Sequence, residues 1–133
     1  IVGLGAGVRY ILDKGIENIR RSEIELTEYL SERIRNIDGI SCYGHMDANR
    51  KTGIVSFNFE EVNCSEVAHV LDRGFEIAVR SGLHCAPMAH KAIGTFPVGT
   101  VRVSLGIFNT KEHIDALILV LSEISKETGK GKR

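Results

Sequence analysis

The chain has 133 residues, of which 43% are hydrophobic and 26% are charged, and its 17 basic and 17 acidic residues cancel. This composition is typical of a single soluble globular domain with a modest core. The balanced charge argues against the basic surface of nucleic-acid-binding proteins. No apolar run approaches the roughly 20 residues of a membrane-spanning helix. We therefore expect neither nucleic acid nor a membrane as a partner.

The three cysteines are Cys42, Cys64 and Cys85, an odd number at wide spacing. Secreted disulfide-rich domains carry even numbers of cysteines in a framework. The pattern therefore favours reduced thiols and a cytoplasmic protein. His84 and His90 flank Cys85, but the paired spacings of structural zinc sites are absent, so no metal site is predicted.

The first half of the chain predicts one long helix and two strands. Apolar residues recur at helical spacing over 16–37, and Asp38-Gly39 ends the amphipathic helix of about 20 residues. A short strand is predicted over 40–43 and a polar loop over 45–52. Strict alternation of apolar and polar residues over 53–59 predicts a half-buried strand.

In the second half, Asn63 and Glu66 resemble a capping box that opens a helix ending at Gly74. The chain then predicts a strand over 76–80, a short helix over 87–93, a loop over 95–100 and a strand over 101–105. Asn109 and Glu112 predict a capped start for a final helix, which has an apolar stripe over 114–124.

This order of elements predicts an α+β fold, with a small, mostly antiparallel sheet backed by helices on one face and a long N-terminal helix. We expect residues 1–125 to form one domain and the Gly/Lys-rich residues 126–133 to be a disordered polar tail. The apolar, glycine-rich residues 1–15 do not match a dinucleotide-binding fingerprint. A domain of this size covers such a segment poorly, so we expect it to pack against a missing large domain.

The segment Arg80-Ser81-Gly82-Leu83-His84-Cys85-Ala86-Pro87 holds the strongest candidate chemistry. A thiol is a nucleophile only as thiolate, and its free pKa of about 8.5 falls beside Arg, His⁺ or a helix N-terminus. This segment supplies all three, so Cys85 is the candidate nucleophile and His84 a candidate for tuning the thiolate or transferring a proton. The competing interpretation is that Cys85 is a small buried hydrophobic residue.

Arg102 is the second candidate. If Val101 and Val103 face the core, Arg102 faces the opposite side of its strand. The planar guanidinium is suited to binding a carboxylate. The competing interpretation is an ordinary surface arginine on the exposed face of a sheet.

Two segments, Ala78–Ala86 (AVRSGLHCA) and Val101–Thr110 (VRVSLGIFNT), resemble the C-terminal part of class V aminotransferase-fold enzymes, in the cysteine desulfurase and selenocysteine lyase branch. The resemblance covers essentially the whole chain. It implies the small C-terminal domain of a pyridoxal-phosphate enzyme that is generally a homodimer. The Schiff-base lysine and most cofactor-binding groups of such enzymes lie in a larger N-terminal domain, which this chain does not contain.

By this resemblance, Cys85 is the nucleophile that takes sulfur from L-cysteine as a persulfide, with release of alanine. Arg102 binds the substrate carboxylate, and Arg80 is a further arginine of the pocket. The role of His84 is inferred from its position alone. No cofactor-binding residue is predicted here, Lys91 being taken as a surface residue, so we expect the isolated chain to be inactive.

Other functions stay open at this point. The substrate of such an enzyme is L-cysteine, selenocysteine or another amino acid, a sulfur-acceptor protein is a further partner, and a class V aminotransferase would not need Cys85. A free-standing thiol protein, acting as a sulfur carrier or redox protein, would need no cofactor. A structural α+β module would bury Cys85 without using it.

Overall fold

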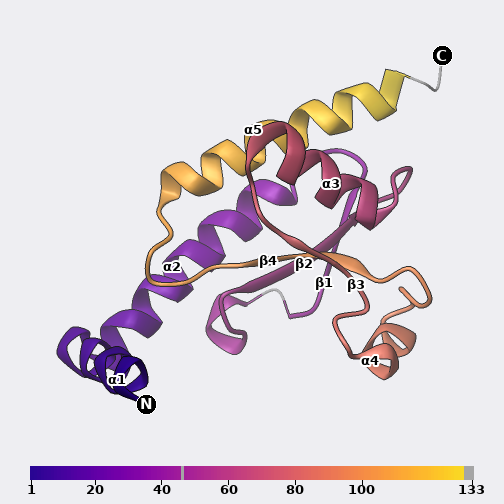
Figure 1. Ribbon diagram of the computed structural model, residues 1–133. Helices are drawn as coiled ribbons and strands as arrows, with labels where there is room; N and C mark the ends of the chain where they lie inside the picture. The colour runs from indigo at the N-terminus through magenta and orange to yellow at the C-terminus, as the bar shows by residue number, and fades with distance from the viewer. Residues whose placement is uncertain (46, 131–133) are drawn as a thin grey trace.

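The computed structural model describes residues 1–45 and 47–130 (Figure 1). The helices are α1 (Val2–Lys14), α2 (Ile16–Ile34), α3 (Cys64–Phe75), α4 (Pro87–Ala92) and α5 (Lys111–Lys130), with a 3-10 turn η1 (Ala48–Arg50). The strands are β1 (Ile40–Tyr43), β2 (Ile54–Phe59), β3 (Arg80–Gly82) and β4 (Thr100–Ser104). None of the helices described has the length and apolar character needed to cross a membrane.

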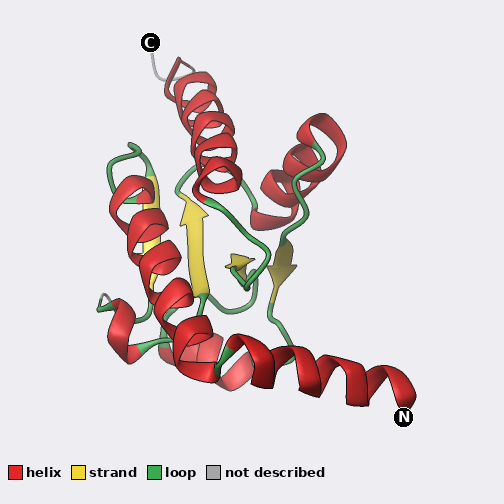
Figure 2. Ribbon diagram, turned by 90° about the vertical axis from the view of Figure 1, so that its left-hand side faces the viewer, coloured by secondary structure: helices red, strands yellow, loops and turns green. Residues whose placement is uncertain are grey.

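The four strands form one antiparallel sheet in the order β1-β2-β4-β3. Helices α2, α3 and α5 lie on one side of this sheet, and α4 lies away from them beyond the end of β3 (Figures 1 and 2). The predicted α+β fold, with helices against one face of an antiparallel sheet, is confirmed.

The core lies between the sheet and these three helices. Alternate residues of β2 and β4 face it, and the register pairs Phe57 with Val101, both fully buried. Each helix adds apolar residues at helical spacing, among them Leu30, Leu71 and Leu121, none of which has exposed surface. Burying large apolar side chains is the main stabilising term of such a domain.

The predicted helix over 16–37 is three residues too long. Helix α2 ends at Ile34, and the amides of Asn36 and Ile37 donate to the carbonyls of Arg33 and Ile34 in a tighter turn. Ile37 is nevertheless buried. The apolar pattern therefore continued beyond the helix, because a turn also directs Ile37 into the core.

The start of α3 is as predicted, but its end is not. The side-chain oxygen of Asn63 accepts a hydrogen bond from the Ser65 amide at 2.9 Å, as an N-cap residue does. The helix passes Gly74 and ends at Phe75, and Glu76 follows in the left-handed region at φ 56°. A left-handed residue cannot begin an extended strand, so the strand predicted over 76–80 is wrong and β3 begins only at Arg80.

The two ends of α5 also differ from the prediction. Asn109 does not cap the helix, because its side-chain oxygen accepts from the Gly106 amide at 2.8 Å within the preceding turn. Instead, the Thr110 hydroxyl bonds to Glu112 and lowers the pKa of that carboxyl. The predicted tail is wrong over 126–130, which continue the helix, and its last residues, 131–133, lie outside the described part of the chain.

Helix α1 differs from the others because none of its residues is buried. Its exposed apolar side chains include Val2, Leu4, Ile11 and Leu12. Gly15, at φ 80°, separates it from α2, and Figure 2 shows it projecting away from the sheet. The apolar side chains of α1 therefore form a large surface that the described residues do not cover.

Candidate functional site

The face of the sheet opposite the core helices is polar. Arg80 of β3 pairs directly with Arg102 of β4, and Arg102 pairs with Ser56 of β2. Directly paired residues point to the same face. The three side chains therefore form a row, which we call the arginine row, across three adjacent strands.

At least one guanidinium donor of the arginine row has no hydrogen-bond acceptor within the row. The Nε atom of Arg102 is buried and has no hydrogen-bond partner among the described residues. Two like charges directly opposite one another destabilise a sheet. The row is therefore suited to an acceptor from outside these strands, and a guanidinium binds a carboxylate most specifically. The interpretation of Arg102 as an ordinary surface residue does not explain its buried, unpartnered Nε.

The cysteine segment forms a tight loop between β3 and α4. Two successive non-glycine residues, His84 and Cys85, have left-handed backbones at φ 50° and 59°, and the Ala86 amide donates to the Leu83 carbonyl at 2.8 Å. Such conformations cost energy and concentrate at functional sites. Helix α4 begins at Pro87 as predicted, two residues beyond Cys85.

Cys85 is the exposed thiol of the three. Cys64 is buried, with its Sγ donating to the Val98 carbonyl at 3.5 Å. Cys42 is half-buried, and burial raises the pKa of its thiol, with Lys51 opposing the rise. The interpretation of Cys85 as a buried hydrophobic residue is therefore wrong, and it is the cysteine most available to react.

His84 reaches back from the loop to β4. Its Nε2 lies 3.2 Å from the Thr100 carbonyl oxygen and 3.5 Å from the Thr100 hydroxyl. A carbonyl oxygen only accepts, so Nε2 carries the proton and donates. Burial, followed by the charge of Arg102, lowers the pKa of His84. Its other nitrogen, Nδ1, is buried and has no partner among the described residues.

The model of the family described as aminotransferase class-V matches residues 1–117. The chain belongs to the aminotransferase class-V family. It is 41% identical over 125 residues to a probable cysteine desulfurase of Methanothermobacter thermautotrophicus, covering 93% of this chain and 31% of that relative. A probable cysteine desulfurase of Halalkalibacterium halodurans is 38% identical over 128 residues, covering 96% of this chain and 30% of the relative.

Solved structures place the class-V chain in the same fold. A cysteine desulfurase of Thermococcus onnurineus superposes with a TM-score of 0.89 at 35% identity, covering 95% of this chain and 30% of that one. A cysteine desulfurase of Escherichia coli gives a TM-score of 0.81 at 24% identity, covering 96% of this chain and 30% of that one. The chain therefore spans about 30% of the length of these relatives.

The class-V family implies pyridoxal phosphate, which forms a Schiff base with a lysine, and the arginine row and the cysteine loop contain no lysine. Lys91 follows on α4, where its Nζ lies 5.0 Å from the ring centroid of Phe96, an exposed side chain. No three His, Cys, Asp or Glu side chains of the described residues are grouped to hold a metal ion.

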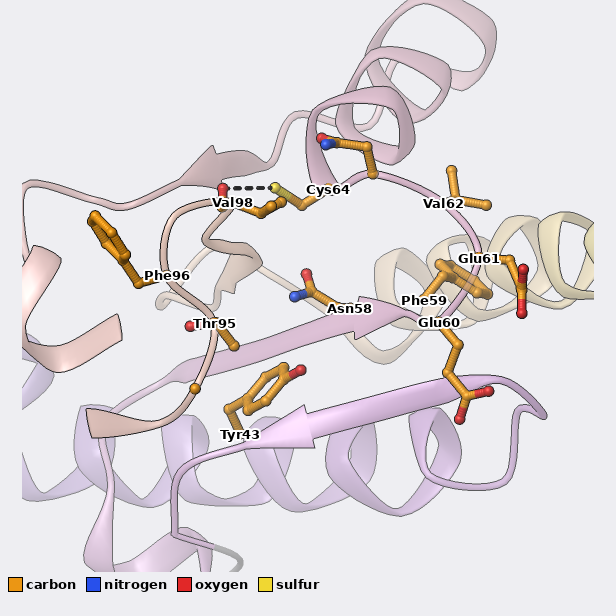
Figure 3. Close-up of a pocket in the computed structure, with 12 residues that line it drawn as sticks. Tyr43, Asn58, Phe59, Glu60, Glu61, Val62, Cys64, Thr95, Phe96 and Val98 are labelled. Carbon is orange, nitrogen blue, oxygen red and sulfur yellow. Dashed lines mark hydrogen bonds between the residues drawn. The ribbon is translucent and has the colours of Figure 1, made fainter. Parts of the chain in front are cut away.

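A polar pocket that the sequence did not predict lies beside the arginine row. It has a volume of about 390 Å³, and Tyr43, Asn58 and Thr95 line it (Figure 3). The Asn58 amide donates to the Gly99 carbonyl at 2.9 Å, and its side-chain oxygen is buried without a partner among the described residues. Strand alternation over 53–59 already put Asn58 on the polar face, which is the signal that could have identified it.

Proposed function

We propose that this chain is the C-terminal domain of a pyridoxal-phosphate-dependent cysteine desulfurase. It would carry the cysteine that accepts sulfur from L-cysteine and the arginine that binds the substrate carboxylate. One observation carries the proposal: the exposed Cys85 lies in the loop that follows β3, and β3 pairs with β4, where the buried Nε of Arg102 has no partner among the described residues, in a chain of the class-V family. The names of the relatives support the same reaction.

In this reaction the Cys85 thiolate forms an S–S bond with the substrate sulfur while the substrate Cβ–S bond breaks, and its electron pair stays with Cβ, which takes up a proton. The product is a persulfide on Cys85, and alanine leaves. Arg102 binds the carboxylate, and the exposed Arg80 guanidinium, directly paired with it, is a second positive charge of the same pocket. His84 belongs to the site because it adjoins the thiol and its side chain bonds to Thr100, two residues before Arg102 on β4.

Pyridoxal phosphate, bound by the larger part of the enzyme, would supply the electron sink that the bond cleavage needs. We place that larger domain against α1, because no residue of this helix is buried. A Cβ on Gly3, Gly5 or Gly7 would meet nothing within 4 Å, so a closely packed neighbour would explain these glycines. The whole enzyme is proposed to be a cytoplasmic homodimer that passes its sulfur to an acceptor protein.

The test compares the full-length enzyme with the 133-residue chain. The full-length enzyme should release alanine from L-cysteine, and Cys85→Ser should abolish this release while Cys42→Ser leaves it unchanged. The isolated chain with added pyridoxal phosphate should release none. Full activity in Cys85→Ser, or alanine from the isolated chain, would overturn the proposal. Selenocysteine, supplied in parallel, separates a selenocysteine lyase from a desulfurase.

A second candidate is a free-standing sulfur-carrier or redox thiol, which the exposure of Cys85 alone would also fit. The uncovered apolar surface of α1 counts against it, because an independent carrier would expose that surface to water. A carrier would take sulfur from a small-molecule persulfide donor onto Cys85 without any cofactor-bearing domain.

A further inference from the structure

The cysteine loop is held in place at two successive points, the first at the end of β3, where the loop begins, and the second at His84. At the first, the backbones of Gly82 and Gly99 are in direct contact, since a Cβ on Gly99 would lie 2.2 Å from the Gly82 carbonyl. Gly82 also pairs with Thr100 in the sheet register. At the second point, the His84 side chain bonds to the carbonyl of the same Thr100. Thr100 is fully buried, so the acceptor of the His84 bond lies inside the fold.

The second attachment requires a proton on Nε2 of His84. In the neutral ring this is the Nε2–H tautomer, which leaves Nδ1 as an acceptor. The charged and titratable groups around the ring are Arg102 of β4, Arg80 of β3 and His90 of α4, whose ring centroid lies 5.7 Å away. None of these three is an anion, and the adjacent Cys85 carries a negative charge only as a thiolate. Burial of the ring and the charge of Arg102 therefore favour the neutral imidazole.

We infer that His84 is a positioning residue, whose Nε2–H bond to the Thr100 carbonyl holds the Cys85 loop at a fixed place relative to Arg102. Thr100 lies two residues before Arg102 on β4, so the bond links the loop to the strand that carries the carboxylate-binding arginine. This inference rests on the proposed function. It assigns His84 the role of an anchor rather than of a proton carrier.

Two further observations favour an anchor. The left-handed backbones at His84 and Cys85 persist only if the surroundings hold them, and the His84 side chain is a contact that the loop itself provides. The Nδ1 atom, the one free to accept a proton, is shielded from solvent, whereas Cys85 is exposed. A nitrogen shielded from solvent cannot pass its proton directly to water, as a proton carrier does, whereas an anchor needs no such access.

The test uses two substitutions of His84 in the full-length enzyme. Glutamine keeps an N–H donor where Nε2 stands but does not titrate near neutral pH, and alanine removes the donor. His84→Ala should lower kcat by about tenfold to 100-fold, because a lost hydrogen bond and a displaced nucleophile have effects of this size. His84→Gln should stay within about threefold of wild type, with the same pH–rate profile and KM.

Thr100→Val is the matched control, since it removes the hydroxyl 3.5 Å from Nε2 but keeps the carbonyl that accepts the bond. It should behave as wild type. If His84→Gln is as slow as His84→Ala and loses a limb of the pH–rate profile, His84 transfers a proton and the inference fails.

A measurement without substitution or turnover separates this inference from the proposed function. Imidazole ¹⁵N chemical shifts should show His84 as the neutral Nε2–H tautomer at pH 7. An Nδ1–H tautomer or an imidazolium would overturn the inference, even in an enzyme that desulfurates cysteine. Conversely, full activity in Cys85→Ser would refute the proposed function and leave the tautomer unchanged.

Discussion

One face of the sheet is apolar and packed under helices, and the other is polar and carries the arginine row. On the face under α2, α3 and α5, Phe57 and Val101 pair without exposed surface. On the other face, one residue along each strand, Ser56 and Arg102 pair, and the Arg102 Nε is buried without a partner among the described residues. The first face is covered by apolar side chains of the same chain, although the hydroxyls of Thr27 and Ser31 on α2 are also buried without a partner among the described residues. The second leaves polar groups unsatisfied, which costs stability unless a ligand or another domain supplies partners.

This difference separates the residues that stabilise the fold from the residues that are proposed to act in the site. Adjacent residues of one strand belong to different faces, so substitutions one position apart should have effects of different kinds. Core positions should change the free energy of unfolding, and positions of the polar face should change activity.

The largest effect is expected at Cys85. Cys85→Ser should lower the rate of alanine release in the full-length enzyme by about 1,000-fold or more, because it removes the nucleophile. The side chain is exposed, so the urea midpoint of the domain should not move. A serine variant with normal turnover would show that sulfur leaves the substrate without this thiol.

The sharpest comparison of the two faces lies on β2. Phe57→Ala should destabilise the domain by about 3–5 kcal/mol, since it opens a cavity in the core. Ser56→Ala, the neighbouring residue on the polar face, should change stability by no more than about 0.5 kcal/mol. Urea unfolding followed by circular dichroism measures both. Equal losses at the two positions would mean that the polar face is also part of the folding core.

Replacing Arg102 should lower activity and leave stability unchanged, which is the opposite of the effect expected at Phe57. Arg102→Lys keeps the charge but loses the planar fork and the Nε donor, so kcat/KM should fall by about tenfold to 100-fold, mainly through KM. Stability should be unchanged or slightly higher, because a buried donor without a partner is removed. Steady-state kinetics and urea unfolding of one preparation test both parts, and a large loss of stability with unchanged KM would count against carboxylate binding.

The smallest effect is expected in the pH dependence of stability. The pKa of His84 is lowered below its ordinary value of 6.5, first by burial and then by Arg102. The folded state then binds this proton less readily than the unfolded state does, so His84 lowers stability as pH falls below about 6.5 and has no effect well above it. His84→Gln should therefore lose less stability than wild type between pH 7 and pH 5 in urea unfolding. A parallel decline in both proteins would show that His84 ionises equally well in the folded state.

Sequence periodicity predicted the core face well, because alternation over 53–59 and the helical stripe of α5 report burial directly. It failed where local backbone geometry decides the outcome. The left-handed Glu76 ended α3 and delayed β3, and the Asn109 side chain bonded within its own turn instead of capping α5. The spacing of residues along the chain shows neither where a left-handed residue ends a helix nor which amide an asparagine side chain bonds to.

The site was predicted only in part. Residue type and a family resemblance predicted Cys85 and Arg102 as site residues, and the sheet register pairs Arg80 directly with Arg102, on the same face. The bond from His84 to Thr100 joins residues 16 positions apart, and the Asn58 pocket joins β1, β2 and the loop after α4. Such contacts depend on strand order, which the sequence pattern leaves open.

The most direct test of the proposed function is to locate the transferred sulfur. The full-length enzyme is incubated with L-cysteine, the persulfide is trapped by alkylation, and its peptides are identified by mass spectrometry. The additional sulfur should be on Cys85, with Cys42 and Cys64 as unmodified internal controls. Turnover with the sulfur on Cys42 or Cys64, or with no sulfur on Cys85, would contradict the assignment of this domain as the carrier of the nucleophile.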